Sequence, residues 1–132
     1  MKNKRFLYQR ICFVLLSGGM LLLPNWGYAL PQGGQIVGGN GSISTPGGGS
    51  MDITGSGNVA IDWNSFNVAV GETVNFKNMQ TVLNYVTGGS KSEILGTING
   101  TGVNVFLVNP NGILFGKTAA VNVGQLTAST RT

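Results

Sequence analysis

The sequence predicts an all-β domain made of many short strands joined by tight turns. From Asn58 onward, runs of β-branched, aromatic and other apolar residues alternate with Gly, Asn or Ser. Sets of these runs recur at intervals of roughly 20 residues, as loose self-similarity. Asparagines stand beside several runs, where stacked amides of successive coils could hydrogen-bond each other: Asn67, Asn75, Asn104 and Asn122. These observations favour a parallel β-solenoid, although a sandwich or a barrel fits the periodicity alone.

The first 29 residues differ in kind from the rest and predict a secretory signal peptide. A basic head precedes an apolar run over residues 11–23. The short segment after it has Gly27 and Ala29 at the two positions that signal peptidase recognises. We expect cleavage between Ala29 and Leu30, which makes residues 1–29 the signal peptide. A membrane anchor is the rival interpretation, but the apolar run is much shorter than the roughly 20 residues that a span takes.

Removing that segment changes the charge and the redox chemistry of the chain. The formal net charge of +4 belongs entirely to the basic head, which contains Lys2, Lys4, Arg5 and Arg10. The neutral remainder gives no argument for nucleic acid as a partner. The single cysteine, Cys12, is removed with the signal peptide. The Arg10-Ile11 pair before it does not fit a lipoprotein signal. Residues 30–132 suffice for one hydrophobic core and one domain, without disulfides.

The segment 30–57 is rich in Gly, Ser and Asn and predicts two short strands and a loop. The strand candidates are residues 35–37 and 42–44, each between Gly-rich turns, and residues 45–50 form the loop. Residues 55–60 fit a loose G-x-G-x-x-A pattern. A dinucleotide site would need a helix after that pattern, and the sequence indicates none.

The apolar runs from Asn58 onward define the other predicted strands, which are residues 59–63, 66–70, 74–76, 82–86, 94–98, 103–108, 113–115 and 119–123. Residues 79–85 also fit a helical spacing, but their β-branched members and the Gly pair behind them favour a strand. The large aromatic side chains are expected in the core or at an end cap of the coils: Trp63, Phe66, Phe76, Phe106 and Phe115.

The most distinctive stretch is the turn Asn109-Pro110-Asn111-Gly112, which stands between the strands 103–108 and 113–115. Pro110 sets φ for the second turn position and excludes a helix. The Asn109 side chain can accept a backbone N–H, and Gly112 suits the last position of a type I turn. The turn alone is explained as a structural link between two core strands, so a functional role has to come from its surroundings.

Those surroundings resemble the N-terminal secretion (TPS) domain of the filamentous haemagglutinin family, the exoproteins of two-partner secretion. The hallmark of that domain is an Asn-Pro-Asn-Gly-Ile turn after an apolar strand. Further matching segments occur in the family's order at residues 30–34, 61–68, 71–76, 83–89, 92–98, 121–124 and 128–130. The chain departs from the family at Tyr85, where Arg is more common. The resemblance implies a right-handed parallel β-helix, which we expect here, preceded by the signal peptide and incomplete at the C-terminus.

The resemblance also implies a function, namely a secretion-targeting domain of a large exported surface exoprotein of the adhesin, haemagglutinin or haemolysin kind. Its partners would be an outer-membrane β-barrel transporter, reached after the general secretion machinery and signal peptidase. The full-length protein would act on a host or neighbouring-cell surface. The signature residues would be Asn109, Pro110, Asn111, Gly112, Ile113 and Phe115, acting either in recognition or in folding. The alternative is a stand-alone β-solenoid adhesin or an autotransporter passenger fragment.

The sequence argues against catalysis in this segment. It contains no His, and its four carboxylates are scattered. Glycoside chemistry needs two acids at a set separation, and the many hydroxyls have no base to activate them. No spacing suggests a metal or cofactor site. Because the chain stops in mid-pattern at Thr132, we expect it to be part of a longer exoprotein.

Overall fold

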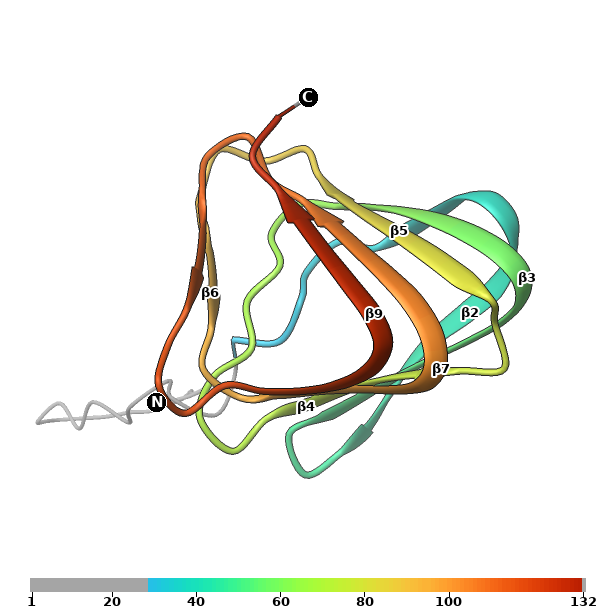
Figure 1. Ribbon diagram of the computed structural model, residues 1–132, viewed down its shortest axis with the longest axis horizontal. Coiled ribbons are helices and arrows are strands. Elements are labelled where there is room, and N and C mark those ends of the chain that lie inside the picture. The colour runs from blue at the N-terminus through green and yellow to red at the C-terminus, as the bar shows by residue number, and fades with distance from the viewer. Residues whose placement is uncertain (1–28, 132) are drawn as a thin grey trace, which may run out of the picture.

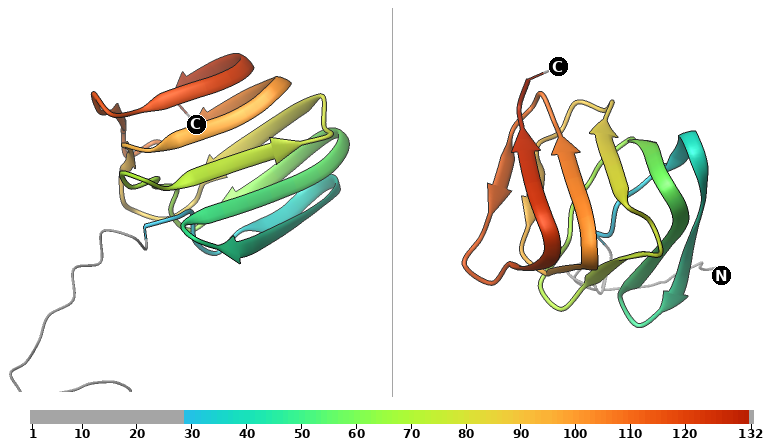
Figure 2. Two further views of the ribbon diagram at one scale, coloured as in Figure 1. Left: turned by 90° about the horizontal axis from the view of Figure 1, so that it is seen from below. Right: turned by 45° about the vertical axis from the view of Figure 1, so that its right-hand side comes forward.

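The chain winds into a stack of coils with three sides (Figure 1). The computed structural model describes residues 29–131. Seen down the stack, the chain runs anticlockwise as it rises toward the viewer, so the coils are right-handed. The β2–β3 pair lies at one end of the stack and β9 at the other (Figure 2). The right-handed parallel β-helix implied by the resemblance is therefore confirmed.

Parallel strands in register build the sides of this stack. The strands are β2 (Gln35–Gly47), β3 (Ser50–Trp63), β4 (Thr73–Lys77), β5 (Thr81–Val86), β6 (Ser92–Ile94), β7 (Thr97–Val108), β8 (Ile113–Phe115) and β9 (Ala120–Ser129). On one side β4 lies between the first halves of β3 and β7, and β9 follows β7. On the next side β5 lies between their second halves. The third side is the short pair β6–β8.

The first coil is closed by a hairpin, because β2 pairs with β3 antiparallel. Gly47 pairs with Ser50, which leaves Gly48-Gly49 as a two-residue turn with φ of 64° and 76°. Positive φ at both positions is the type I′ geometry that suits a twisted hairpin. The predicted strands 35–37 and 42–44 are thus parts of one strand, and the predicted loop 45–50 is wrong except for its central glycines.

The core lies inside the coils, where alternate residues of each strand point. Equivalent positions stack on each other, for example Val59, Val82 and Val105 on β3, β5 and β7. Trp63 and Phe66 meet edge to face, with ring centroids 5.6 Å apart. Burial of such stacked apolar side chains supplies the main stabilisation of a domain without disulfides.

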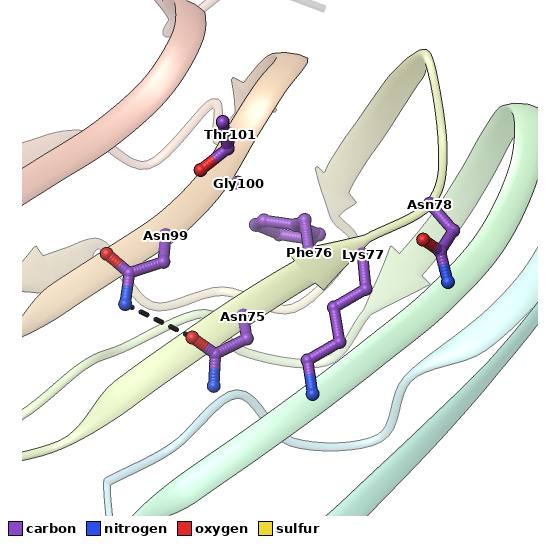
Figure 3. Close-up of a pocket in the computed structure, with 7 residues that line it drawn as sticks. All are labelled: Asn75, Phe76, Lys77, Asn78, Asn99, Gly100 and Thr101. Carbon is purple, nitrogen blue, oxygen red and sulfur yellow. Dashed lines mark hydrogen bonds between the residues drawn. The ribbon is translucent and has the colours of Figure 1, made fainter.

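A ladder of polar side chains runs up the outside of the β3–β4–β7–β9 side. Asn122 donates to Asn99, Asn99 to Asn75 and Asn75 to Asp52, at 3.0, 3.1 and 2.9 Å. Figure 3 shows the middle rung, with Asn75 and Asn99 facing one another on neighbouring strands. The predicted amide ladder is therefore present, but its members differ in part. Asn75 and Asn122 belong to it, Asn99 was not predicted, and Asn67 instead accepts the Glu93 N–H at 2.8 Å.

Three other predictions are wrong in detail. Residues 66–70 lie on the third side of the first coil, but only Val68 bridges to a neighbour there, Ile94, and the predicted strand 94–98 is broken by a corner at residues 95–96. Phe106 is in register with exposed Leu83 on the outer surface, so it is not a core residue. The strand preferred for residues 79–85 is confirmed by β5.

The predicted signal peptide lies outside the described residues, apart from Ala29. Within residues 29–131 the fold contains no helix of the length and hydrophobicity that crossing a bilayer requires.

Candidate functional site

The turn at residues 109–112 occupies a corner of the coil, between β7 on one side and β8 on the next. The Gly112 N–H donates to the Asn109 carbonyl at 3.1 Å and closes the turn with Pro110 at its second position. The Asn109 side-chain oxygen accepts the Asn111 N–H at 2.9 Å. The turn geometry expected from the sequence is therefore present, with the Asn109 side chain in the expected role.

Asn109 is completely buried and bonds to coils on both sides. Its side-chain amide donates to the Ser90 carbonyl at 3.0 Å and to the Ser92 hydroxyl at 2.9 Å, both one coil earlier. Its backbone N–H donates to the Ser129 carbonyl at 2.9 Å, one coil later. A buried amide with every group paired fixes the register of the strands that it joins. Asn109 thus fastens three successive coils at one corner.

The tip of the turn faces solvent. Pro110 and Asn111 are exposed, and the Asn111 amide donates back to the Gly88 carbonyl at 2.8 Å. The Gly112 carbonyl accepts the Ser92 N–H at 2.9 Å. Pro110 and Asn111 are therefore the most accessible members of the turn, Gly112 is half-buried, and Asn109 is inaccessible.

The two flanking signature residues lie on β8. Ile113 is half-buried and packs against the core. Phe115 is in register with the buried Ile94 but is 37% exposed, because no strand within residues 29–131 stacks on β8. Both side chains therefore sit at the open end of the described stack, next to the turn.

The sequence reasoning missed the corner that receives the turn. Gly88, Ser90 and Ser92 supply three of its hydrogen-bond partners. A Cβ on Gly88 would lie 2.1 Å from the Asn64 carbonyl oxygen, so only glycine fits beneath the turn. The signal for this corner is the Gly-Gly-Ser run, which stands one coil before the turn in the register of β5 against β7.

The polar groups outside this corner serve the stack as well. A surface pocket of about 350 Å³ over β4 and β7 is lined by Asn75, Phe76, Lys77, Asn78, Asn99, Gly100 and Thr101 (Figure 3). Asn75 and Asn99 of this lining belong to the ladder, and Lys77 pairs with Asp52 at 3.2 Å. Within residues 29–131 no three His, Cys, Asp or Glu side chains gather as metal ligands.

The comparison with known families identifies this arrangement. The family model described as the TPS secretion domain matches residues 30–132. The chain belongs to the TPS secretion domain family. Proteins with this domain are secreted exoproteins of Gram-negative bacteria, and the domain implies a transporter of the two-partner secretion type. The family is one of secretion domains of adhesin-like exoproteins and not one of enzymes.

Individual relatives agree with this assignment. The chain is 36% identical over 105 residues to a heme/hemopexin-binding protein of Haemophilus influenzae strain Rd, covering 77% of this chain and 12% of the relative. A second heme/hemopexin-binding protein of Haemophilus influenzae is 36% identical over 80 residues, which is 8% of its length. The crystal structure of the HMW1 secretion domain from the same species superposes with a TM-score of 0.72 at 34% identity. That match covers 77% of this chain and 28% of the other. The chain thus spans a small part of the curated relatives that it matches.

Proposed function

We propose that residues 30–132 target a longer exoprotein for export through a dedicated outer-membrane β-barrel transporter. In this proposal the general secretion machinery delivers the chain to the periplasm, and signal peptidase cuts between Ala29 and Leu30. The periplasmic domains of the transporter then recognise the segment. The observation that carries the proposal is the match of residues 30–132 to the TPS secretion domain.

The same segment starts the folding of the exported chain. Each coil of the described stack pairs in parallel with the one before it, and β9 pairs with β7 over nearly its whole length. Among the described strands none covers the other edge of β9. An open parallel edge is a template on which further coils can add, since each repeat of a solenoid contacts only its neighbours. We infer that coils added beyond residue 131 would continue this stack outside the cell.

Within this function the four turn residues divide into two roles. Asn109 is a structural fastener, because its buried amide and backbone N–H join three coils. Pro110 and Asn111 form the exposed tip and are the turn residues most open to contact with the transporter in the folded state. Separate substitutions at Asn109 and at Asn111 can therefore test whether the turn acts in folding or in recognition by the transporter.

The experiment is secretion of the tagged chain by cells with and without the candidate transporter. We expect the chain in the medium only when the transporter is present. Asn109→Ala should lose protease resistance in the periplasm, whereas Asn111→Ala should keep it. If Asn111→Ala then fails to leave the cell, the tip is a recognition element, and if it leaves normally, the Asn111 side chain has no part in recognition. Appearance in the medium without the transporter would overturn the proposal and favour a stand-alone adhesin.

The surface activity of the whole exoprotein is a separate question. Heme and hemopexin binding are named for relatives of which this chain covers 12% and 8%. Action of the whole protein on a host or neighbouring-cell surface stays a proposal, and it is tested by binding of the complete exoprotein to such cells.

A further inference from the structure

Glu72 is a buried carboxylate that the export function does not explain. It sits in the corner before β4 with 1% of its surface exposed. The ion pairs found within residues 29–131 are Lys77–Asp52 and Lys91–Glu93, and neither includes Glu72. A carboxylate removed from water in this way ordinarily needs a cation or several hydrogen bonds.

The two oxygens of Glu72 have different partners. Oε1 accepts the Ala69 N–H at 2.8 Å, within the turn in which the Glu72 N–H donates to the Ala69 carbonyl at 3.0 Å. This contact is a local cap that the turn alone explains. Oε2 accepts the backbone N–H of Ala29 at 3.1 Å, a residue 43 positions away in sequence. The second oxygen therefore reaches the residue at which the signal peptide is expected to end.

Cleavage between Ala29 and Leu30 changes this contact. It removes the donor to Oε2 and creates a positively charged amino group on Leu30. The path from the Ala29 nitrogen to the Leu30 nitrogen is three bonds, or about 4.3 Å, so the new group starts within reach of the same oxygen.

The chain after the cut is already held in place for such a contact. Gln32 exchanges backbone hydrogen bonds with residues 64 and 65, Pro31 is buried, and Leu30 packs against the core. Ala29 also lines a cavity of about 310 Å³ whose lining is mostly apolar but includes Asn67 and Glu93, and its other members are Val68, Ala69, Val70 and Leu95. Surroundings of low polarity strengthen the attraction between an ammonium group and a carboxylate.

We propose that Glu72 is the docking carboxylate for the amino terminus that signal peptidase releases at Leu30. The buried charge is then neutralised only in the processed chain, so removal of the signal peptide stabilises the first coils. The proposal rests on the cleavage site of the proposed function and not on the transporter, because cleavage needs only export to the periplasm.

The test measures how fast an amine-directed acylating reagent modifies the α-amino group at neutral pH. The processed chain is collected from the medium, or from the periplasm if it is not released, and its first residue is determined. Only the uncharged form of the amine reacts, and pairing with Glu72 favours the charged form. The reaction should therefore be at least about tenfold slower in the folded chain than in the same chain in denaturant. Glu72→Gln should restore the faster rate, and Asp62→Asn, at a carboxylate on β3 that does not line this cavity, should leave the slow rate unchanged.

A second variant covers the case in which Glu72→Gln does not fold. One Gly inserted before Leu30 keeps Glu72 and moves the amino group away from it, so the reaction should again become fast. Equal rates for the folded and denatured chain, a first residue other than Leu30, or a slow rate in a folded Glu72→Gln variant would each overturn the proposal. Transporter-dependent secretion could still hold in all three cases, so the two proposals fail separately.

Discussion

Four polar side chains within residues 29–131 are almost completely removed from solvent, and each forms hydrogen bonds that join separate parts of the stack: Glu72, Asn84, Ser92 and Asn109. Asn84 accepts the Trp63 indole N–H at 2.9 Å and donates to the Phe106 carbonyl at 3.1 Å. Asn109 and Ser92 bond to each other. A one-residue slip would turn the apolar inward residues outward, and a buried amide with all its groups paired is likewise satisfied in one register only. These residues therefore help to fix the register between successive coils.

Asn109→Ala tests this at the turn. The substitution leaves the Ser90 carbonyl and the Asn111 N–H without their partner, and we expect a loss of about 2–4 kcal/mol in the free energy of unfolding. Asn111→Ala, at an exposed side chain, should cost about 1 kcal/mol or less. Urea unfolding of both exported variants provides the comparison. Equal losses would show that the buried amide has no special weight in the stack.

Asp52 at the base of the ladder should make stability depend on pH. The hydrogen bond from Asn75, and then that from Lys77, lowers the pKa of Asp52 below its ordinary value of 3.8. Because the pKa is lower in the folded state, the ionised carboxylate stabilises the fold above the ordinary pKa. That stabilisation is lost as the pH falls through the folded-state value.

We therefore expect acid to weaken the natural chain more than the Asp52→Asn variant between about pH 5 and pH 2. Urea midpoints measured across this range check it. Asn75→Ala removes the strongest cause of the shift and should flatten the curve in the same direction. Parallel curves for all three proteins would mean that Asp52 titrates alike in the folded and unfolded chain.

The β2–β3 hairpin depends on backbone conformation at its turn and not on contacts. A Cβ on Gly48 or on Gly89 would meet no atom within 4 Å, but Gly48 has a φ of 64° while Gly89 is not among the residues with positive φ. We expect Gly48→Ala to cost about 1–2 kcal/mol through left-handed strain. Gly89→Ala should be neutral or stabilising by up to about 1 kcal/mol. Thermal melts of the two variants separate strain from packing, and equal melting temperatures would contradict the type I′ assignment.

The elements that the sequence predicted well are those with an unbroken apolar alternation. β4, β5 and β8 were located within two residues because their inward positions carry Val, Phe or Ile. The strand β2 was predicted only as two fragments, residues 35–37 and 42–44, since its glycines interrupt the apolar pattern and its continuity comes from pairing with β3. Residues 66–70 were predicted as a strand, yet only Val68 bridges to a neighbour, and the strand predicted for residues 94–98 is interrupted by a corner at residues 95–96. Corners are set by the stack and not by local propensity.

The candidate site shows the same division at the scale of the whole molecule. The turn and the Asn109–Asn111 contact are local, and the sequence predicted both. The Ser90 and Ser92 contacts depend on a register between coils that lie 17 to 19 residues apart, and no local pattern contains that register. The ladder members Asp52 and Asn99 were missed for the same reason, because stacking on Asn75 becomes visible only once the coils are aligned.

The β9 end of the stack should be less stable than its middle. β5 and β7 each lie between two parallel neighbours, whereas β9 pairs only with β7 among the described strands. Backbone amides at an uncovered edge open without disturbing a second interface, so they should exchange with solvent sooner. We expect protection against hydrogen exchange to be at least about tenfold lower across β9 than across β5 and β7.

Hydrogen exchange followed by mass spectrometry on the exported chain, which begins at Leu30, measures this difference peptide by peptide. A chain in which another coil, or a second molecule, covers β9 would instead show even protection along the stack. Dilution separates these cases, because a contact between molecules weakens with falling concentration and a coil of the same molecule does not. Even protection at every concentration would mean that the edge of β9 is closed within one chain, and the proposed growth of the β-helix from that edge would then be wrong.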